Sequence, residues 1–170
     1  MHNINKEDKK MMYDDDFIQL VSFNLGREEY GIDIMKVDCI VREEEIRSIP
    51  NAPLFVEGVF NLRGEIIPVI SLHKRFFIAE TRKDEADDLL KGFIIIKVHN
   101  MKLAVKIDKV SKVTNIDKKK IQQPPQMNRG IGSEYIQGVT SLDDQYIIIL
   151  DIDRLFAIKE LKQLEVLNRK

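Results

Sequence analysis

The stretch Gly58-Val59-Phe60-Asn61-Leu62 is echoed later in the chain by Gly138-Val139-Thr140-Ser141-Leu142. Each copy precedes a short turn and an apolar run of strand length. A second pair repeats in the same order, because Tyr30-Gly31-Ile32-Asp33-Ile34 matches Leu103-Ala104-Val105-Lys106-Ile107. Two ordered echoes predict two related β units in tandem, each of about five strands. Small barrels that close their own edges would keep such a pair soluble.

Short apolar runs separated by turn residues fill most of the chain, as is typical of a mostly β protein. Predicted strands cover 17–25, 30–34, 37–46, 55–62 and 66–72, then 93–98, 102–107, 109–116, 135–142 and 145–152. Pro68 lacks a backbone N–H, so its run is predicted to be an edge strand or to contain a bulge. A short helix is predicted at 73–77 and an amphipathic one at 154–168.

The expected organisation is one main domain with a polar tail. Residues 1–16 are predicted to be a flexible tail, 17–158 the domain, and 159–170 the end of the C-terminal helix. Residues 80–91 carry eight charges in twelve positions, which predicts a solvated linker between the two halves.

The amino-acid composition and net charge narrow the kinds of partner that this chain is expected to bind. The 170 residues are 44% hydrophobic and 7% aromatic, and 27 basic against 28 acidic residues leave a net charge of −1. Neither nucleic acid nor an anionic membrane is expected as a partner. Cys39 is the only cysteine, and no apolar run reaches the ~20 residues of a spanning helix. A cytoplasmic protein without membrane insertion is the expectation.

Few residue patterns suggest chemistry. His2, His73 and His99 have no second ligand at metal-binding spacing. Ser71 and His73 would share a strand face, but a solvated strand end is the favoured interpretation over a catalytic pair. Cys39 is expected to be a small apolar residue rather than a reactive thiol. No catalytic residue, metal ligand or cofactor is predicted, so the chain is not expected to be an enzyme.

Two clusters of charged residues are each interpreted as solvent-exposed turns or loops rather than as binding sites. Asp143-Asp144 with Asp151 and Asp153 could be drawn as a cation site, but acidic turns are commoner. Lys118-Lys119-Lys120 has no interleaved aromatic residues, which favours a solvated loop.

The run 58–70, Gly-Val-Phe-Asn-Leu-Arg-Gly-Glu-Ile-Ile-Pro-Val-Ile, resembles the most characteristic stretch of the CheW family of chemotaxis coupling proteins. The resemblance extends over about 16–158. It implies two SH3-like five-stranded subdomains with a shared core. It also implies an adaptor that joins chemoreceptors to the histidine kinase CheA in membrane-associated arrays. The CheA regulatory domain would meet one barrel end, and the cytoplasmic tip of the receptor would lie in the groove between the subdomains.

The resemblance also implies site residues. Expected receptor-binding residues are Val37, Cys39, Gly58, Arg63 and Gly64, and expected kinase-binding residues are Ile32, Ile34 and Met35. Core packing is the alternative for Ile32 and Ile34, whereas Met35 has the opposite strand parity. Arg63 could instead be a solvated turn residue or pair with Glu43, Glu44 or Glu65.

The chain departs from the family pattern at three positions. Cys39, Ser71 and His73 stand where the family often has Glu, Asp and Arg, which bears on partner choice more than on fold. The alternative functions are a small β-barrel nucleic-acid binder and the isolated regulatory domain of a CheA-like kinase.

Overall fold

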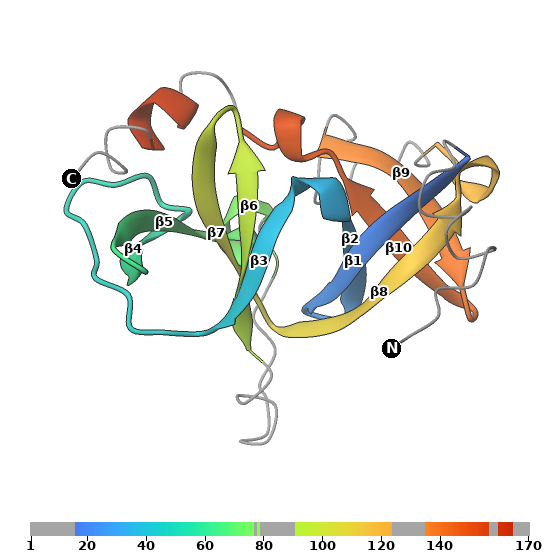
Figure 1. Ribbon diagram of the computed structural model, residues 1–170, viewed down its shortest axis with the longest axis horizontal. Coiled ribbons are helices and arrows are strands. Elements are labelled where there is room, and N and C mark those ends of the chain that lie inside the picture. The colour runs from blue at the N-terminus through green and yellow to red at the C-terminus, as the bar shows by residue number, and fades with distance from the viewer. Residues whose placement is uncertain (1–15, 77, 79–90, 124–134, 157–159, 165–170) are drawn as a thin grey trace, which may run out of the picture.

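The computed structural model describes residues 16–76, 78, 91–123, 135–156 and 160–164, and its strands form two five-stranded sheets (Figure 1). The first sheet has the order β8 (Lys109–Asp117), β1 (Phe17–Leu25), β2 (Glu28–Asp33), β10 (Gln145–Leu150) and β9 (Ile136–Leu142). The second has the order β3 (Val37–Arg42), β6 (Gly92–Val98), β7 (Met101–Ile107), β5 (Glu65–Ser71) and β4 (Val56–Leu62). The mostly β fold and the positions of the ten strands are confirmed.

The two sheets are not the two halves of the chain. The first sheet combines β1 and β2 with β8, β9 and β10, and the second combines β3, β4 and β5 with β6 and β7. Each copy of the repeat therefore gives its first hairpin to one sheet and its last three strands to the other. The predicted tandem arrangement is wrong because a local apolar pattern forms a strand without choosing its partner. Within each sheet, a parallel pair joins strands from the two copies of the repeat: β2 with β10 in the first sheet and β5 with β7 in the second.

The chain crosses between the sheets twice along the series of described strands. The first crossing is the 3-10 helix η1 (Ile34–Lys36), between β2 and β3, and the second is Asp108, between β7 and β8. Residues 80–90 of the predicted linker lie outside the described residues. The segment connects β5 with β6 in the second sheet, so it does not divide the sheets.

Neither sheet closes into a barrel through the described strand pairs. Instead, one isolated β-bridge connects the two edges of each sheet. In the second sheet, Arg47, which follows edge strand β3, pairs with Val59 of edge strand β4. In the first sheet, Gln122, which follows edge strand β8, pairs with Val139 of edge strand β9. The Arg47 bridge has N–O distances of 2.8 and 2.9 Å. The sheets are thus not closed by their strand pairs, and the expected SH3-like barrels are not confirmed.

A large apolar core lies between the two sheets and contains side chains from both. Phe23 and Tyr30 of the first sheet stack with ring centroids 6.1 Å apart in this core. A smaller cluster around Phe60 and Phe93 belongs to the second sheet, and one around Leu20 and Ile147 belongs to the first. Central strands are buried on both faces, which explains why β6 is a continuous apolar run.

Pro68 does not mark an edge strand, because β5 lies between β7 and β4. The ladder to β7 starts only at Val69, and Val59, opposite Pro68, directs its backbone groups to Arg47. The missing N–H of Pro68 therefore costs the ladder no hydrogen bond. The alternative prediction, a bulge, fits better: the partner strand has a register shift between Val56 and Gly58.

Helix α2 (Leu72–Phe76) follows β5 as predicted, one residue earlier than expected. Of the predicted helix 154–168, residues 160–164 are helical, Arg154 belongs to the 3-10 helix η4 (Ile152–Arg154), and 157–159 and 165–168 lie outside the described residues. Arg75 of α2 donates to the Leu155 carbonyl and to Glu160 Oε1, both at 3.1 Å. At the other end of the chain, Lys118 N–H donates to the Asp16 carbonyl at 2.9 Å. Asp16 is therefore part of the fold, and the predicted tail reduces to residues 1–15.

Candidate partner-binding surface

The β4–β5 turn is held by its own backbone and by one side chain. Arg63 and Gly64 have positive φ values of 53° and 89°, as expected for the tight turn of a two-residue hairpin. The Asn61 side-chain oxygen accepts a hydrogen bond from Gly64 N–H at 2.9 Å. These contacts fix the turn without using the guanidinium of Arg63.

Arg63 is exposed, and none of the ion pairs found among the described residues includes it. Two of its predicted acidic partners are engaged elsewhere, since Glu43 lies 3.7 Å from Lys106 and Glu65 lies 3.4 Å from Lys102. The alternative of an internal Arg63 ion pair is therefore not seen among the described residues. A rigid turn thus presents a planar cation with its fork of donors toward solvent.

Gly58 is a buried backbone position rather than a contact surface. Its φ is 148°, and a Cβ atom there would lie 2.1 Å from the Arg47 carbonyl oxygen. Glycine is therefore required for the bridge between β4 and Arg47. A role of Gly58 in receptor binding would be exerted through the position of the β4–β5 hairpin.

Val37 and Cys39 lie on β3 with their side chains half-buried. Val37 packs on the core between the sheets, and Cys39 packs on the cluster around Phe60. Burial raises the pKa of the Cys39 thiol, and the nearby Asp38 carboxylate raises it further, while Arg63 and Lys102 act in the opposite direction. The structure agrees with an apolar role, although Cys39 is half-buried rather than fully buried.

The three predicted kinase-binding residues differ in exposure. The Ile32 side chain lies in the core with 0% exposed, so it has no free surface for a partner. Ile34 is half-buried against the same core, whereas Met35 is 76% exposed, as its strand parity predicted. Met35 borders an open hollow of about 620 Å³ between η1, the β6–β7 turn and η4.

Lys102 connects the surroundings of Met35 with those of Arg63. It lines the hollow beside Met35, and its ammonium lies 3.4 Å from Glu65 and 3.8 Å from Asp38. Lys102 thus lies in the same hollow as the exposed Met35 and forms an ion pair with Glu65, which follows the exposed Arg63 and Gly64 in the β4–β5 turn. Sequence reasoning missed Lys102, because nothing in its local pattern distinguishes it from any solvent-facing lysine of a strand.

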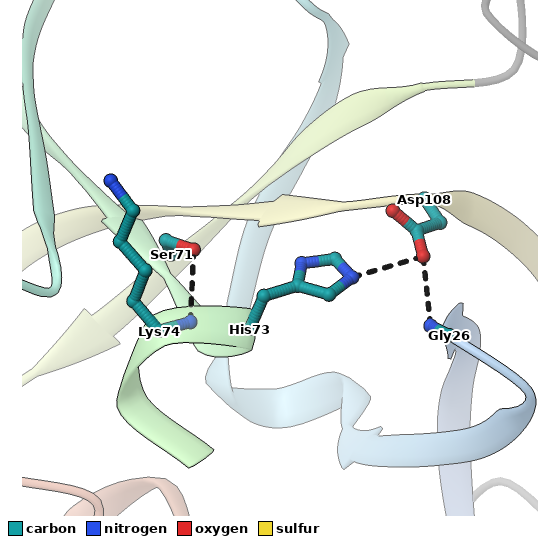
Figure 2. Close-up of polar contacts among 5 residues, drawn as sticks. All are labelled: Gly26, Ser71, His73, Lys74 and Asp108. Atoms are coloured by element: carbon teal, nitrogen blue, oxygen red, sulfur yellow. Dashed lines mark hydrogen bonds and ion pairs between the residues drawn. The ribbon is translucent and has the colours of Figure 1, made fainter. Parts of the chain in front are cut away.

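The other sequence candidates do not assemble into a reaction centre. Ser71 Oγ accepts from Lys74 N–H, whereas the His73 ring faces Asp108 (Figure 2). Both side chains are buried, so the predicted solvated strand end is wrong. Ser71 caps α2, and His73 bonds across the fold.

The charged clusters are also accounted for. Asp143 pairs with Lys112, Asp151 with Arg154 and Asp153 with Lys36, and no group of three potential metal ligands occurs in the described part of the chain. Lys118–Lys120 form an exposed 3-10 turn, η2. Within the described ranges, no helix is long and apolar enough to cross a membrane.

Comparisons with known proteins agree with this architecture. The family model of the CheW-like domain matches residues 19–160. Chemotaxis protein CheW of Treponema pallidum is 49% identical over 154 residues, with 91% of each chain covered. Its namesake from Klebsiella aerogenes is 32% identical over 143 residues, with 84% of each covered. The crystal structure of scaffolding protein TtCheW from Thermoanaerobacter tengcongensis has a TM-score of 0.75 at 36% identity and covers 84% of this chain and 90% of that one. This chain therefore belongs to the CheW family of chemotaxis scaffold proteins.

Proposed function

We propose that this chain is a non-catalytic adaptor that couples chemoreceptors to the histidine kinase CheA. The observation that carries the proposal is that Arg63 and Met35 are both exposed, which offers partners one polar and one apolar contact. An adaptor needs two such sites on one rigid body.

The receptor tip binds on the Arg63 side. The exposed guanidinium accommodates a carboxylate or the free carbonyls at a helix end, and its fork of donors defines their orientation. Cys39 of β3 supplies apolar area near the guanidinium, while Val37 acts through its packing on the core between the sheets. Gly58 and Gly64 set the hairpin that carries the arginine.

The regulatory domain of the kinase binds on the Met35 side. Met35 is unbranched and exposed, which suits a small transient interface. Ile34 supports it from the core edge, and Ile32 contributes only through core packing. In the cell the chain is cytoplasmic and is recruited to membrane-associated receptor arrays.

The test is co-sedimentation with array-forming receptor fragments and kinase. The purified chain should enter the pellet with receptor fragments and kinase together, and the kinase should then become active. Failure to bind either protein, or equal retention on DNA or RNA, would contradict the proposal and favour the nucleic-acid alternative. Autophosphorylation is no part of the expected activity, because the relatives matched over 84–91% of their length carry the CheW name and not that of a kinase.

A further inference from the structure

A buried polar network lies at the second crossing between the sheets (Figure 2). His73 Nε2 lies 3.1 Å from Asp108 Oδ2, and Gly26 N–H donates to the same oxygen at 2.8 Å. The Asp108 N–H in turn donates to the Asn24 carbonyl at 3.2 Å. The two ionisable side chains are only 4% and 12% exposed.

This network joins the two sheets. His73 lies on α2, which follows β5 of the second sheet, and Gly26 lies in the β1–β2 turn of the first. An ionised Asp108 carboxylate can only accept hydrogen bonds, so its contact with His73 requires the ring tautomer that carries the hydrogen on Nε2. The other ring nitrogen of His73 is buried and has no hydrogen-bond partner among the described residues. The His73 ring therefore makes its hydrogen bond to Asp108, at the second crossing between the sheets.

The contacts at the first crossing are more exposed. In the repeat, Met35 occupies the position that corresponds to Asp108, and it is exposed. Its N–H donates to the side chain of Asp33, the last residue of β2, and the neighbouring Lys36–Asp153 pair is about half exposed. An exposed pair of this kind holds two segments weakly, whereas a buried charge-assisted hydrogen bond is strong and directional.

We propose that His73 and Asp108 are positioning residues that fix the orientation of the first sheet relative to the second. The apolar core holds the sheets together, but the hydrophobic effect has no direction of its own. The network supplies the direction at one crossing. The inference goes beyond the proposed function, because orientation is a property of the isolated chain.

The experiment measures residual dipolar couplings of the full chain in a weakly aligning medium, fitted separately for the two sheets. In the unmodified chain one alignment tensor should fit both sheets. The decisive variant combines His73→Leu with Asp108→Leu, which removes both polar partners at once and so avoids stranding a buried carboxylate. His73→Gln, which keeps a donor at the position of Nε2, is the conservative variant. Lys74→Ala is the matched control, since Lys74 of α2 pairs with Glu57 of β4, and no hydrogen bond or ion pair found for its side chain among the described residues reaches the first sheet.

In the double Leu variant the two sheets should require different tensors, and the Gly26 amide should exchange at least about tenfold faster. The Gln variant and the Lys74→Ala control should retain one tensor. A folded double Leu variant with one shared tensor and unchanged Gly26 exchange would overturn the proposal. If that variant does not fold, His73→Leu alone is measured, and the same two readouts decide. Loss of the common tensor in Lys74→Ala would also overturn it.

Discussion

Gly58 and Arg47 approach so closely that a Cβ atom on Gly58 would lie 2.1 Å from the Arg47 carbonyl oxygen. Gly138 occupies the same place in the second copy of the repeat, but its Cβ would meet the Cγ2 of Ile121 first, at 2.4 Å, and the Gln122 carbonyl oxygen only at 3.1 Å. The two glycines therefore differ in what an added side chain would mainly displace: backbone in one case, a side-chain methyl group in the other.

Gly58→Ala should lower the free energy of unfolding by about 3 kcal/mol or more, because the bridge must open and the φ of 148° becomes strained. Gly138→Ala should cost only about 1 kcal/mol. Urea denaturation of both variants measures the difference. Equal losses would mean that the Arg47 bridge is not a rigid part of the fold.

Arg63→Ala and Arg63→Lys should each change the free energy of unfolding by less than about 1 kcal/mol, because the side chain is exposed. Both should lose receptor-stimulated kinase activity, since lysine lacks the fork of donors. The matched control is Arg27→Ala, which alters an exposed arginine in the β1–β2 turn of the other sheet. Normal activation by both Arg63 variants would remove Arg63 from the receptor site.

The variant Arg63→Asn tests the stability of the turn separately from the role of the arginine in kinase activation. Asparagine tolerates the left-handed conformation that Arg63 adopts, so this variant should be as stable as the unmodified chain or slightly more stable. It should still fail to activate the kinase. A melting temperature several degrees lower would show that the arginine side chain supports the hairpin.

Met35→Arg should weaken binding of the kinase regulatory domain while the fold stays intact, because the side chain is 76% exposed. Loss of an apolar contact at a small interface is worth about 1–2 kcal/mol, or roughly a fivefold to thirtyfold weaker affinity. Titration calorimetry measures it, with Tyr146→Arg as the control, since Tyr146 is 73% exposed on β10. Unchanged binding by Met35→Arg would exclude this residue from the interface.

The Cys39 thiol should react slowly with iodoacetamide at neutral pH, because burial and Asp38 raise its pKa and so reduce the thiolate fraction. Asp38→Asn should speed the reaction, and Arg63→Ala should slow it further, because the guanidinium lowers the pKa. Because the pKa of the Cys39 thiol is higher in the folded state than in the unfolded state, protonation of the thiol stabilises the fold. This contribution is fully present at pH values below the ordinary pKa of a thiol, and it is lost as the pH rises through the pKa of the folded state. Faster alkylation of Arg63→Ala would contradict the assigned geometry.

Removing residues 1–15 should leave the melting temperature within about 2 °C of the full chain. Extending the deletion to Asp16 removes the carbonyl that accepts from Lys118 and should lower it further. A loss of several degrees on deletion of 1–15 alone would show that the tail packs on the domain.

The sequence was sufficient to predict the strands, because each is bounded by turn residues and has the apolar content that a buried sheet needs. The β4–β5 turn was also predictable, since Arg63-Gly64 lies between two apolar runs. Pairing was not predictable: Ile148 lies beside Tyr30 in a parallel ladder, and no local pattern links residues so far apart.

The candidate surface was predicted less completely than the fold. Exposure of Met35 followed from strand parity, but η1 interrupts the strand there, and parity alone left Ile32 and Ile34 undecided between core and surface. The His73–Asp108 contact had no local signal, because its partners are 35 residues apart and come together only when the second crossing forms.

Because each sheet contains strands from both repeats, the order of synthesis limits the order in which the two sheets can form. As the chain leaves the ribosome, the β1–β2 hairpin emerges first, yet its neighbours β8 and β10 are among the last segments made. The second sheet can be completed once β7 has emerged, about two-thirds of the way along the chain. Until β10 follows, the apolar face of the first hairpin has only the second sheet to cover it. Folding of the nascent chain should therefore begin with the second sheet, and truncated chains that end before β8 should be prone to aggregation.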